Sequence, residues 1–173
     1  MLKAILFFTN FNRTTITKTL KKILLICFLF SISVYSQENK NYFVHLSSDP
    51  MVNPSAAIMS IHAASEALNQ GHDVTYFAAG DGVKILLKNV IRNLHTVTHH
   101  GGNSDRISKM AGSKLLEFSK NGGTIHVSAG SFLTYGITKE NYKEHLINIS
   151  NINWSYPKEL IEESSKADIV FSY

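Results

Sequence analysis

The chain of 173 residues contains a single cysteine, Cys27, which lies in a short apolar run near the start of the sequence. With no second cysteine, an internal disulfide is excluded, so packing alone must stabilise the folded chain. No cysteine follows Cys27. Whatever the rest of the chain does, it does without a thiol.

A long hydrophobic run is also missing. The most apolar stretch, Ile23 to Val34, is preceded by lysines and interrupted by serines, and it is shorter than the roughly 20 apolar residues that cross a bilayer. A basic flank, a short apolar stretch and the small residue Ser36 predict a secretory signal peptide over residues 1–36. An uncleaved anchor is the weaker alternative. A lipoprotein is disfavoured because Cys27 lies within the run. We therefore expect an exported protein, periplasmic or secreted, without a membrane span after cleavage.

The excess of basic residues belongs to this leader. Five of the 17 Lys and Arg residues and none of the 13 acidic residues precede the predicted cleavage site, so residues 37–173 hold 12 basic and 13 acidic side chains, a net charge of −1. Without a basic stripe to neutralise phosphates, nucleic-acid binding is disfavoured. The 137 residues of this part predict one domain.

Apolar runs alternate with helical patterns along residues 37–173, and this alternation predicts an α/β fold. We expect a single small domain with a mainly parallel sheet of about five strands flanked by helices. Asn53 caps a helix that begins at Pro54 and ends at Gly71. The expected strands cover residues 42–46, 74–78, 124–128, 149–154 and 168–173. The fourth strand suits an edge of the sheet because it is polar. Further helices are expected over 83–87, 104–120, 138–145 and a segment from 157.

Small polar residues follow three of these strands. Ligands of open α/β sheets bind outside the carboxyl ends of the strands, so we expect a shallow binding site there. Asp49 before Pro50, and Asp81 between two glycines, are also typical turn residues, and we favour that structural role for both. The binding candidates are Ser47, Ser48, Asp49, Asp81, Ser128 and Ser131.

A catalytic interpretation and a metal-binding interpretation are both weaker than the binding-site interpretation. Ser128 lacks the G-x-S-x-G elbow of serine hydrolases, although His45 and His126 lie on expected strands. A serine at a strand end more often caps the next turn or helix. Zinc sites need three or four ligands, and His99 and His100 beside two glycines supply two at most. We expect solvated loop histidines there, with no cofactor.

Three segments together resemble the DsrE/DsrF-like family, which includes sulfur-relay subunits and predicted peroxiredoxins. They are YFVHLSSDPMVNPSAAIMSIHAASEALNQGHDVTYFAAGDGVKILLK, GGTIHVSAGSFLTYGIT and KADIVFSY. The resemblance covers Tyr42 to Tyr173. It implies a small parallel sheet flanked by helices, assembled into homo-oligomers or hetero-oligomers with a related subunit.

The resemblance also implies what this chain lacks. Active members carry a sulfur-accepting cysteine just after the third strand, where this sequence has Ser128. A hydroxyl cannot form a persulfide, so we do not expect independent thiol catalysis. The leading hypothesis is an exported binding or assembly module, linked to sulfur or redox metabolism. The alternatives are a partner-dependent sulfur-relay or oxidoreductase subunit and a metal-binding envelope protein.

Overall fold

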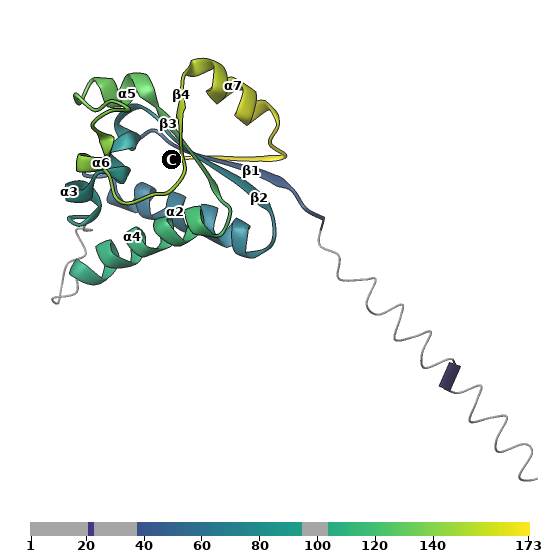
Figure 1. Ribbon diagram of the computed structural model, residues 1–173. Coiled ribbons are helices and arrows are strands. Elements are labelled where there is room, and N and C mark those ends of the chain that lie inside the picture. Colours follow the sequence, from purple (N-terminus) through teal and green to yellow (C-terminus); the bar gives the residue numbers. More distant parts are fainter. Residues whose placement is uncertain (1–20, 23–37, 95–103) are drawn as a thin grey trace, which may run out of the picture. The chain divides into compact units, whose positions relative to one another are not determined.

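The apolar runs pair side by side into one parallel sheet. In the computed structural model, which describes residues 21–22, 38–94 and 104–173, five strands lie in the order β4-β3-β2-β1-β5 (Figure 1). Every neighbouring pair is parallel. This confirms the predicted five-stranded α/β fold and the edge position of β4. The strands are β1 (Asn41–Leu46), β2 (Asp73–Ala78), β3 (Thr124–Ser128), β4 (Ile152–Ser155) and β5 (Ile169–Ser172).

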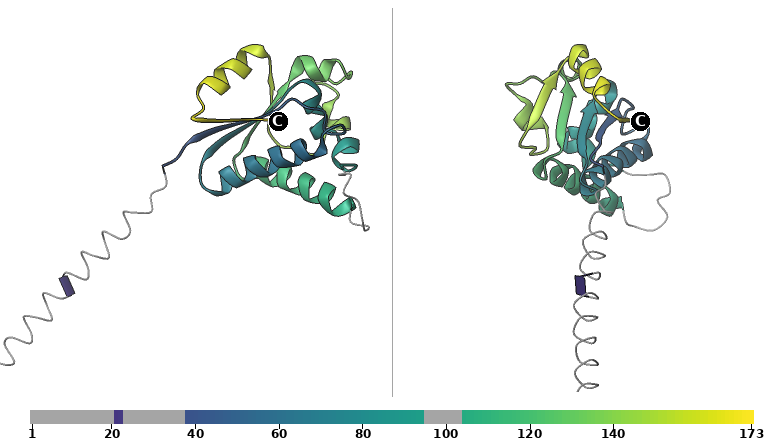
Figure 2. Two further views of the ribbon diagram at one scale, coloured as in Figure 1. Left: turned by 180° about the vertical axis from the view of Figure 1, so that it is seen from behind. Right: turned by 90° about the vertical axis from the view of Figure 1, so that its right-hand side faces the viewer.

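The helices divide unequally between the two faces of the sheet. The chain moves in one direction from β1 to β4, and α2 (Pro54–Asn69) and α4 (Ser104–Lys120) cover one face. The return from β4 to β5 runs the opposite way, so a right-handed crossover places α7 (Pro157–Ser165) on the other face (Figure 2). The shorter elements are η1 (Gly80–Leu86), α3 (Lys88–Ile91), α5 (Ala129–Leu133) and α6 (Tyr142–His145).

Local signals placed α2 correctly and misplaced α6. Asn53 accepts a hydrogen bond from the Ala56 N–H and Pro54 opens α2, as predicted. The helix expected over residues 138–145 begins only at Tyr142, because the Asn141 side chain bonds the Thr138 N–H in a preceding turn. The predicted leader, residues 1–36, and the loop with His99 and His100 lie largely or wholly outside the described residues.

The main core lies between the sheet and the pair α2 and α4. Alternate residues of the central strands point to this face, including Leu46, Tyr76 and Val127, and all three are fully buried. They meet Ile61 of α2 and Leu115 of α4 in one apolar cluster. Burial of this apolar area is the main force that holds the helices on the sheet.

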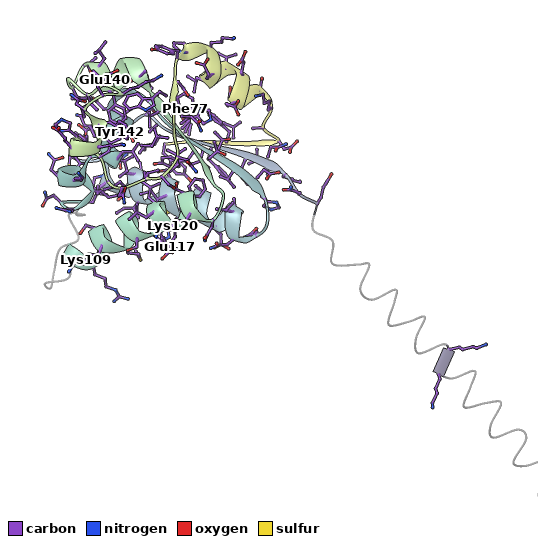
Figure 3. The ribbon with its side chains drawn as sticks, viewed as in Figure 1. Phe77, Lys109, Glu117, Lys120, Glu140 and Tyr142 are labelled. Carbon is purple, nitrogen blue, oxygen red and sulfur yellow. The ribbon has the colours of Figure 1, made fainter. Side chains whose placement is uncertain are left out.

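The opposite face, under α7, carries rings instead of aliphatic side chains. Phe43 and Phe77 are buried there, and the Phe77 ring (Figure 3) stacks on His126 with centroids 5.6 Å apart. His126 Nδ1 lies 2.8 Å from Ser155 Oγ, so this strand histidine is hydrogen-bonded. Burial lowers the pKa of His126, and it also lowers the pKa of His45 on β1.

The sheet approaches η1 most closely at Gly82. A Cβ atom at this position would lie 2.2 Å from the Leu46 carbonyl oxygen, which is backbone and cannot swing aside. The Gly82 N–H also donates to the carbonyls of Ser47 and Ala79, at 3.2 and 2.9 Å. Only glycine fits between the end of β1 and η1.

We predict that Gly82→Ala lowers the free energy of unfolding by about 3 kcal/mol or more, because the added methyl group overpacks the backbone. The matched control is Gly130→Ala, since a Cβ there meets nothing within 4 Å. It should be neutral or stabilising by up to about 1 kcal/mol. Urea denaturation measures both variants, and equal losses in the two would contradict the close approach.

His126, which is buried, and His45, which is half-buried, predict a loss of stability in mild acid. The folded state holds the pKa of His126 and of His45 below the ordinary 6.5, so the unfolded chain binds more protons as the pH falls below 6.5. Stability is therefore present above that pH and is lost as the pH falls toward the folded-state pKa. Burial is the largest cause; Lys166, at the end of α7, also lowers the pKa of His126, while Glu163 and Glu159 of α7 raise it.

The change that tests this is His126→Gln, which removes one titrating group. Denaturation at about pH 7.5 and about pH 5.5 should show a smaller acid-induced loss in the variant than in the unmodified protein. An identical loss in both proteins would mean that His126 does not contribute. Carboxylates with lowered pKa, such as Asp49, lose their contribution only below the ordinary value of 3.8.

Candidate functional site

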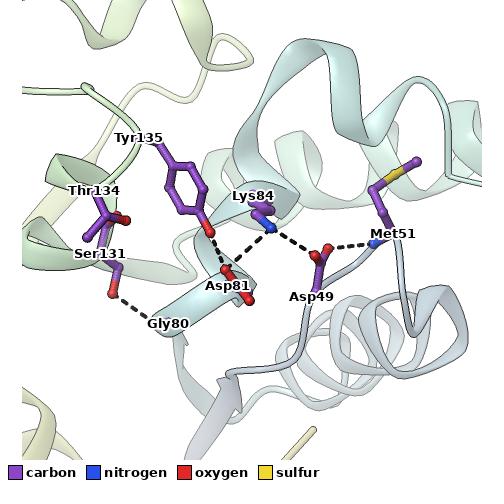
Figure 4. A network of polar contacts seen from close by, with 8 residues as sticks. All are labelled: Asp49, Met51, Gly80, Asp81, Lys84, Ser131, Thr134 and Tyr135. Carbon is purple, nitrogen blue, oxygen red and sulfur yellow. Dashed lines mark hydrogen bonds and ion pairs between the residues drawn. The ribbon is translucent and has the colours of Figure 1, made fainter.

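Four side chains from three separate segments meet at the carboxyl edge of the sheet (Figure 4). Lys84 Nζ lies 2.8 Å from Asp49 Oδ2 and 3.3 Å from Asp81 Oδ1. The Tyr135 hydroxyl donates to Asp81 Oδ1, and Lys84 Nζ lies 5.1 Å from the centroid of the Tyr135 ring. We call this group the Lys84 network. It brings together Asp49 and Asp81, two residues that the sequence predicted.

Each acid also has the turn role expected from its local sequence. Asp49 Oδ1 accepts the Met51 N–H at 2.9 Å, which shapes the turn from β1 into α2. Asp81 lies in the first turn of η1, three residues before Lys84. The structural and the site interpretation of these two residues are therefore compatible.

The Lys84 network carries one net negative charge. The hydrogen bond from Lys84 is the main reason that the pKa of Asp49 is low, and for Asp81 the Tyr135 hydroxyl comes first and Lys84 second. These same contacts raise the pKa of Lys84, led by the hydrogen bond to Asp49. Two carboxylates against one ammonium leave the surface around the Lys84 network anionic. We call this surface the mouth. A free anion gains little from binding there.

A chain of hydroxyl groups connects the end of β2 with the end of β3. The Gly80 N–H donates to Ser131 Oγ at 2.9 Å, and the Ser131 hydroxyl donates to Ser128 Oγ at 2.9 Å. Ser128 Oγ also accepts the Ser131 N–H at 3.2 Å as the N-cap of α5. Both acceptor positions of Ser128 are therefore occupied, by a backbone N–H and by a hydroxyl. A nucleophilic serine needs instead a base that accepts its proton. This arrangement suits a cap and a hydrogen-bond donor better than a nucleophile.

The side chains of Ser47 and Ser48 belong neither to the Lys84 network nor to the hydroxyl chain of Ser128 and Ser131. Ser47 instead contacts the residue that follows β5. The Ser47 N–H and hydroxyl both donate to the Tyr173 carbonyl, at 2.9 and 3.2 Å. Ser48 Oγ is buried and has no hydrogen-bond partner among the described residues. The two serines mark the point where strand order reverses around β1, while the Lys84 network lies over β1 and β2.

The sequence interpretation missed Lys84 and Tyr135. Lys84 carried a weak signal, since it lies three residues after Asp81 on a short helix. Tyr135 carried none, because it lies 54 residues beyond its partner Asp81. Only the crossover between β2 and β3 brings them together.

Metal and membrane interpretations find no support in the described part of the chain. Within residues 38–94 and 104–173, no three His, Cys, Asp or Glu side chains are placed so that they could hold a metal ion. Among the helices of the same residues, none is both long and apolar enough to cross a bilayer. The expectation of solvated loop histidines at His99 and His100 falls outside these residues and stays a prediction.

The fold and the site place the chain among small α/β proteins with a parallel sheet. The chain belongs to the DsrE/DsrF-like family, whose family model matches residues 40–173. This family is associated in general with sulfur relay, and its members often form oligomers.

Two solved structures share the fold at low sequence identity. The ychN protein from E. coli is 15% identical, with a TM-score of 0.54, and the match covers 79% of this chain and 100% of that one. A conserved protein of unknown function from Bacteroides thetaiotaomicron, BT1422, is also 15% identical, with a TM-score of 0.50 and coverage of 78% and 95%. No curated protein matches the chain.

We predict that Lys84→Met raises the pKa of Asp49 toward its ordinary value of 3.8. The lysine is the main cause of the low pKa, and its loss leaves two carboxylates without their shared cation. The cost in stability at neutral pH should stay within about 1 kcal/mol, because the ion pair is partly solvated. Carboxyl-carbon NMR titration measures the pKa. Lys139→Met, outside the network, should leave it unchanged, and an equal shift in both variants would refute the assignment.

Proposed function

We propose that this chain is an exported, thiol-free binding and assembly subunit, which works by docking a partner protein at the mouth formed by the Lys84 network. The observation that carries the proposal is the state of Ser128. It stands where the resemblance places the sulfur-accepting cysteine, and its oxygen is committed to Ser131. The domain thus keeps the family scaffold and lacks the group that would carry sulfur.

The surface around the mouth supports a protein partner. Met51 and Val52, which follow Asp49 and Pro50, are 45% and 82% exposed, and Tyr135 is 39% exposed. Aromatic and Met side chains are enriched at protein interfaces, whose rims are polar and open to solvent. The net negative charge of the network favours a partner that presents Lys or Arg, and it disfavours small sulfur oxyanions as the ligand.

A partner-dependent sulfur-relay role is the second candidate, and family membership favours it. In that case a cysteine-bearing, related subunit would supply the thiol, and this chain would supply position and contacts. The same docking surface serves both candidates. They differ in whether the complex accepts sulfur.

We predict that Val52→Lys weakens the assembly. Size-exclusion chromatography with light scattering should show the protein from envelope extracts as an oligomer or complex, and the variant should shift toward the monomer mass. An added ammonium group would lose its hydration at the contact and repel the Lys or Arg side chains of the partner. The control is Ile161→Lys on α7, since Ile161 is similarly exposed at 66% but lies on the other face.

The result that would overturn the assembly proposal is an unmodified protein that elutes as a lone monomer from envelope extracts. A complex that persists in both variants would move the docking surface away from the mouth. Sulfur transfer from a persulfide donor to the isolated complex, read by mass spectrometry, then separates the plain assembly role from the relay role.

We further predict that Ser128→Cys gains sulfur acceptance from a persulfide donor, because it restores a thiol at the end of β3. The matched control, Ser113→Cys, places a thiol at an exposed position of α4. Thiol labelling and intact mass measure the persulfide on each variant. Preferential sulfur loading of the Ser128→Cys protein supports a retained scaffold. Equal loading of the two variants would show that the position has no special competence.

A further inference from the structure

A hollow that is separate from the Lys84 network lies at the same part of the molecule. It is bordered by α5, by the segment that leads to α6 and by the end of β4. Its volume is 280 Å³, and its walls include Gly130, Leu133, Ile137, Trp154 and Tyr156. None of the four residues of the Lys84 network lines it. Its role is therefore separate from the docking proposed above.

One wall of the hollow is a rigid aromatic surface. Trp154 of β4 packs against Phe132 of α5, with ring centroids 5.5 Å apart, and meets Tyr142 of α6 edge-on at 5.6 Å. These contacts hold the half-buried indole in place, and Trp154 itself lines the hollow. Leu133 and Tyr156 on the rim are 64% and 58% exposed, which leaves apolar area in water beside that face.

The polar part of the rim is electrically neutral. Lys139 and Glu140 both line the hollow, near α5 and α6, where Figure 3 labels Glu140 and Tyr142. A hydrogen bond with Thr138 is the main cause that lowers the pKa of Glu140, so its carboxylate stays ionised at neutral pH. The rim thus offers one strong donor and one strong acceptor with no net charge. A ligand with a net charge would be attracted by one and repelled by the other.

We propose that this hollow is a binding site for a flat, uncharged aromatic molecule of one or two rings that carries a carboxamide or a similar donor and acceptor group. The ring stacks on Trp154 between Leu133 and Tyr156, a geometry that aromatic pairs favour. The amide oxygen accepts from Lys139, and the amide N–H donates to Glu140. The volume of 280 Å³ suits such a small ligand.

The chain contains a built-in reporter for this site, because Trp154 is its only tryptophan. The probes are benzamide and 2-naphthamide, with cyclohexanecarboxamide as the matched probe that lacks an aromatic face. Calorimetry measures affinity, and shielding of Trp154 from acrylamide quenching locates the ligand. We expect 2-naphthamide to bind at least about tenfold more tightly than cyclohexanecarboxamide. Benzoate and benzylamine should both bind more weakly than benzamide.

Gly130→Leu tests the location by filling the hollow. The substitution is sterically allowed, since a Cβ at Gly130 meets nothing within 4 Å and its φ is not positive. Affinity for 2-naphthamide should fall at least about tenfold, while Ser113→Leu on α4 changes it less than about twofold. If Gly130→Leu fails to fold, Leu133→Ala, at an exposed position, serves in its place and should weaken binding about threefold.

Three results would overturn the proposal. The first is no saturable binding of 2-naphthamide up to its solubility limit, and the second is equal affinity for the aromatic and the saturated amide. The third is binding that leaves the quenching of Trp154 unchanged. Each leaves the assembly test untouched, because that test uses Val52 and the mass of the complex.

Discussion

The parallel direction of all five strands is the constraint on which the rest of the structure depends. It places the carboxyl ends of β1, β2 and β3 at one edge, so the segments that follow them must share that space. At Gly82 the backbone of η1 comes so close to the Leu46 carbonyl that no side chain fits. This approach brings Lys84 to Asp49, 35 residues earlier in the chain. The site is therefore a direct result of the strand direction.

The sequence predicted the features that arise from local forces. The apolar strands, the cap of α2 at Asn53, the edge position of β4 and the capping role of Ser128 all follow from short-range chemistry. The start of α6 was wrong because the Asn141 side chain forms a turn with Thr138 that a helical pattern does not reveal. Lys84 and Tyr135 were missed because their contacts depend on how the strands cross. No local signal reports the packing of segments about 50 residues apart.

The division of polar and apolar groups at the carboxyl edge suggests two uses of one scaffold. The Lys84 network keeps one net negative charge and has exposed apolar neighbours, an arrangement that favours contact with a protein that presents basic side chains. Beyond α5, the fixed indole of Trp154 and a neutral rim favour a small flat molecule. Ser128 and Ser131 lie between these regions and hold the ends of β2 and β3 together through hydroxyl groups.

The central claim is that residues 38–173 accept no sulfur from a persulfide donor during function. The most direct test is the intact mass and peptide mapping of the protein isolated from its own host after exposure to a persulfide donor, without reducing agents. The account predicts no added sulfur mass on any peptide from residues 38–173. A stable sulfur adduct on a peptide from these residues would contradict it.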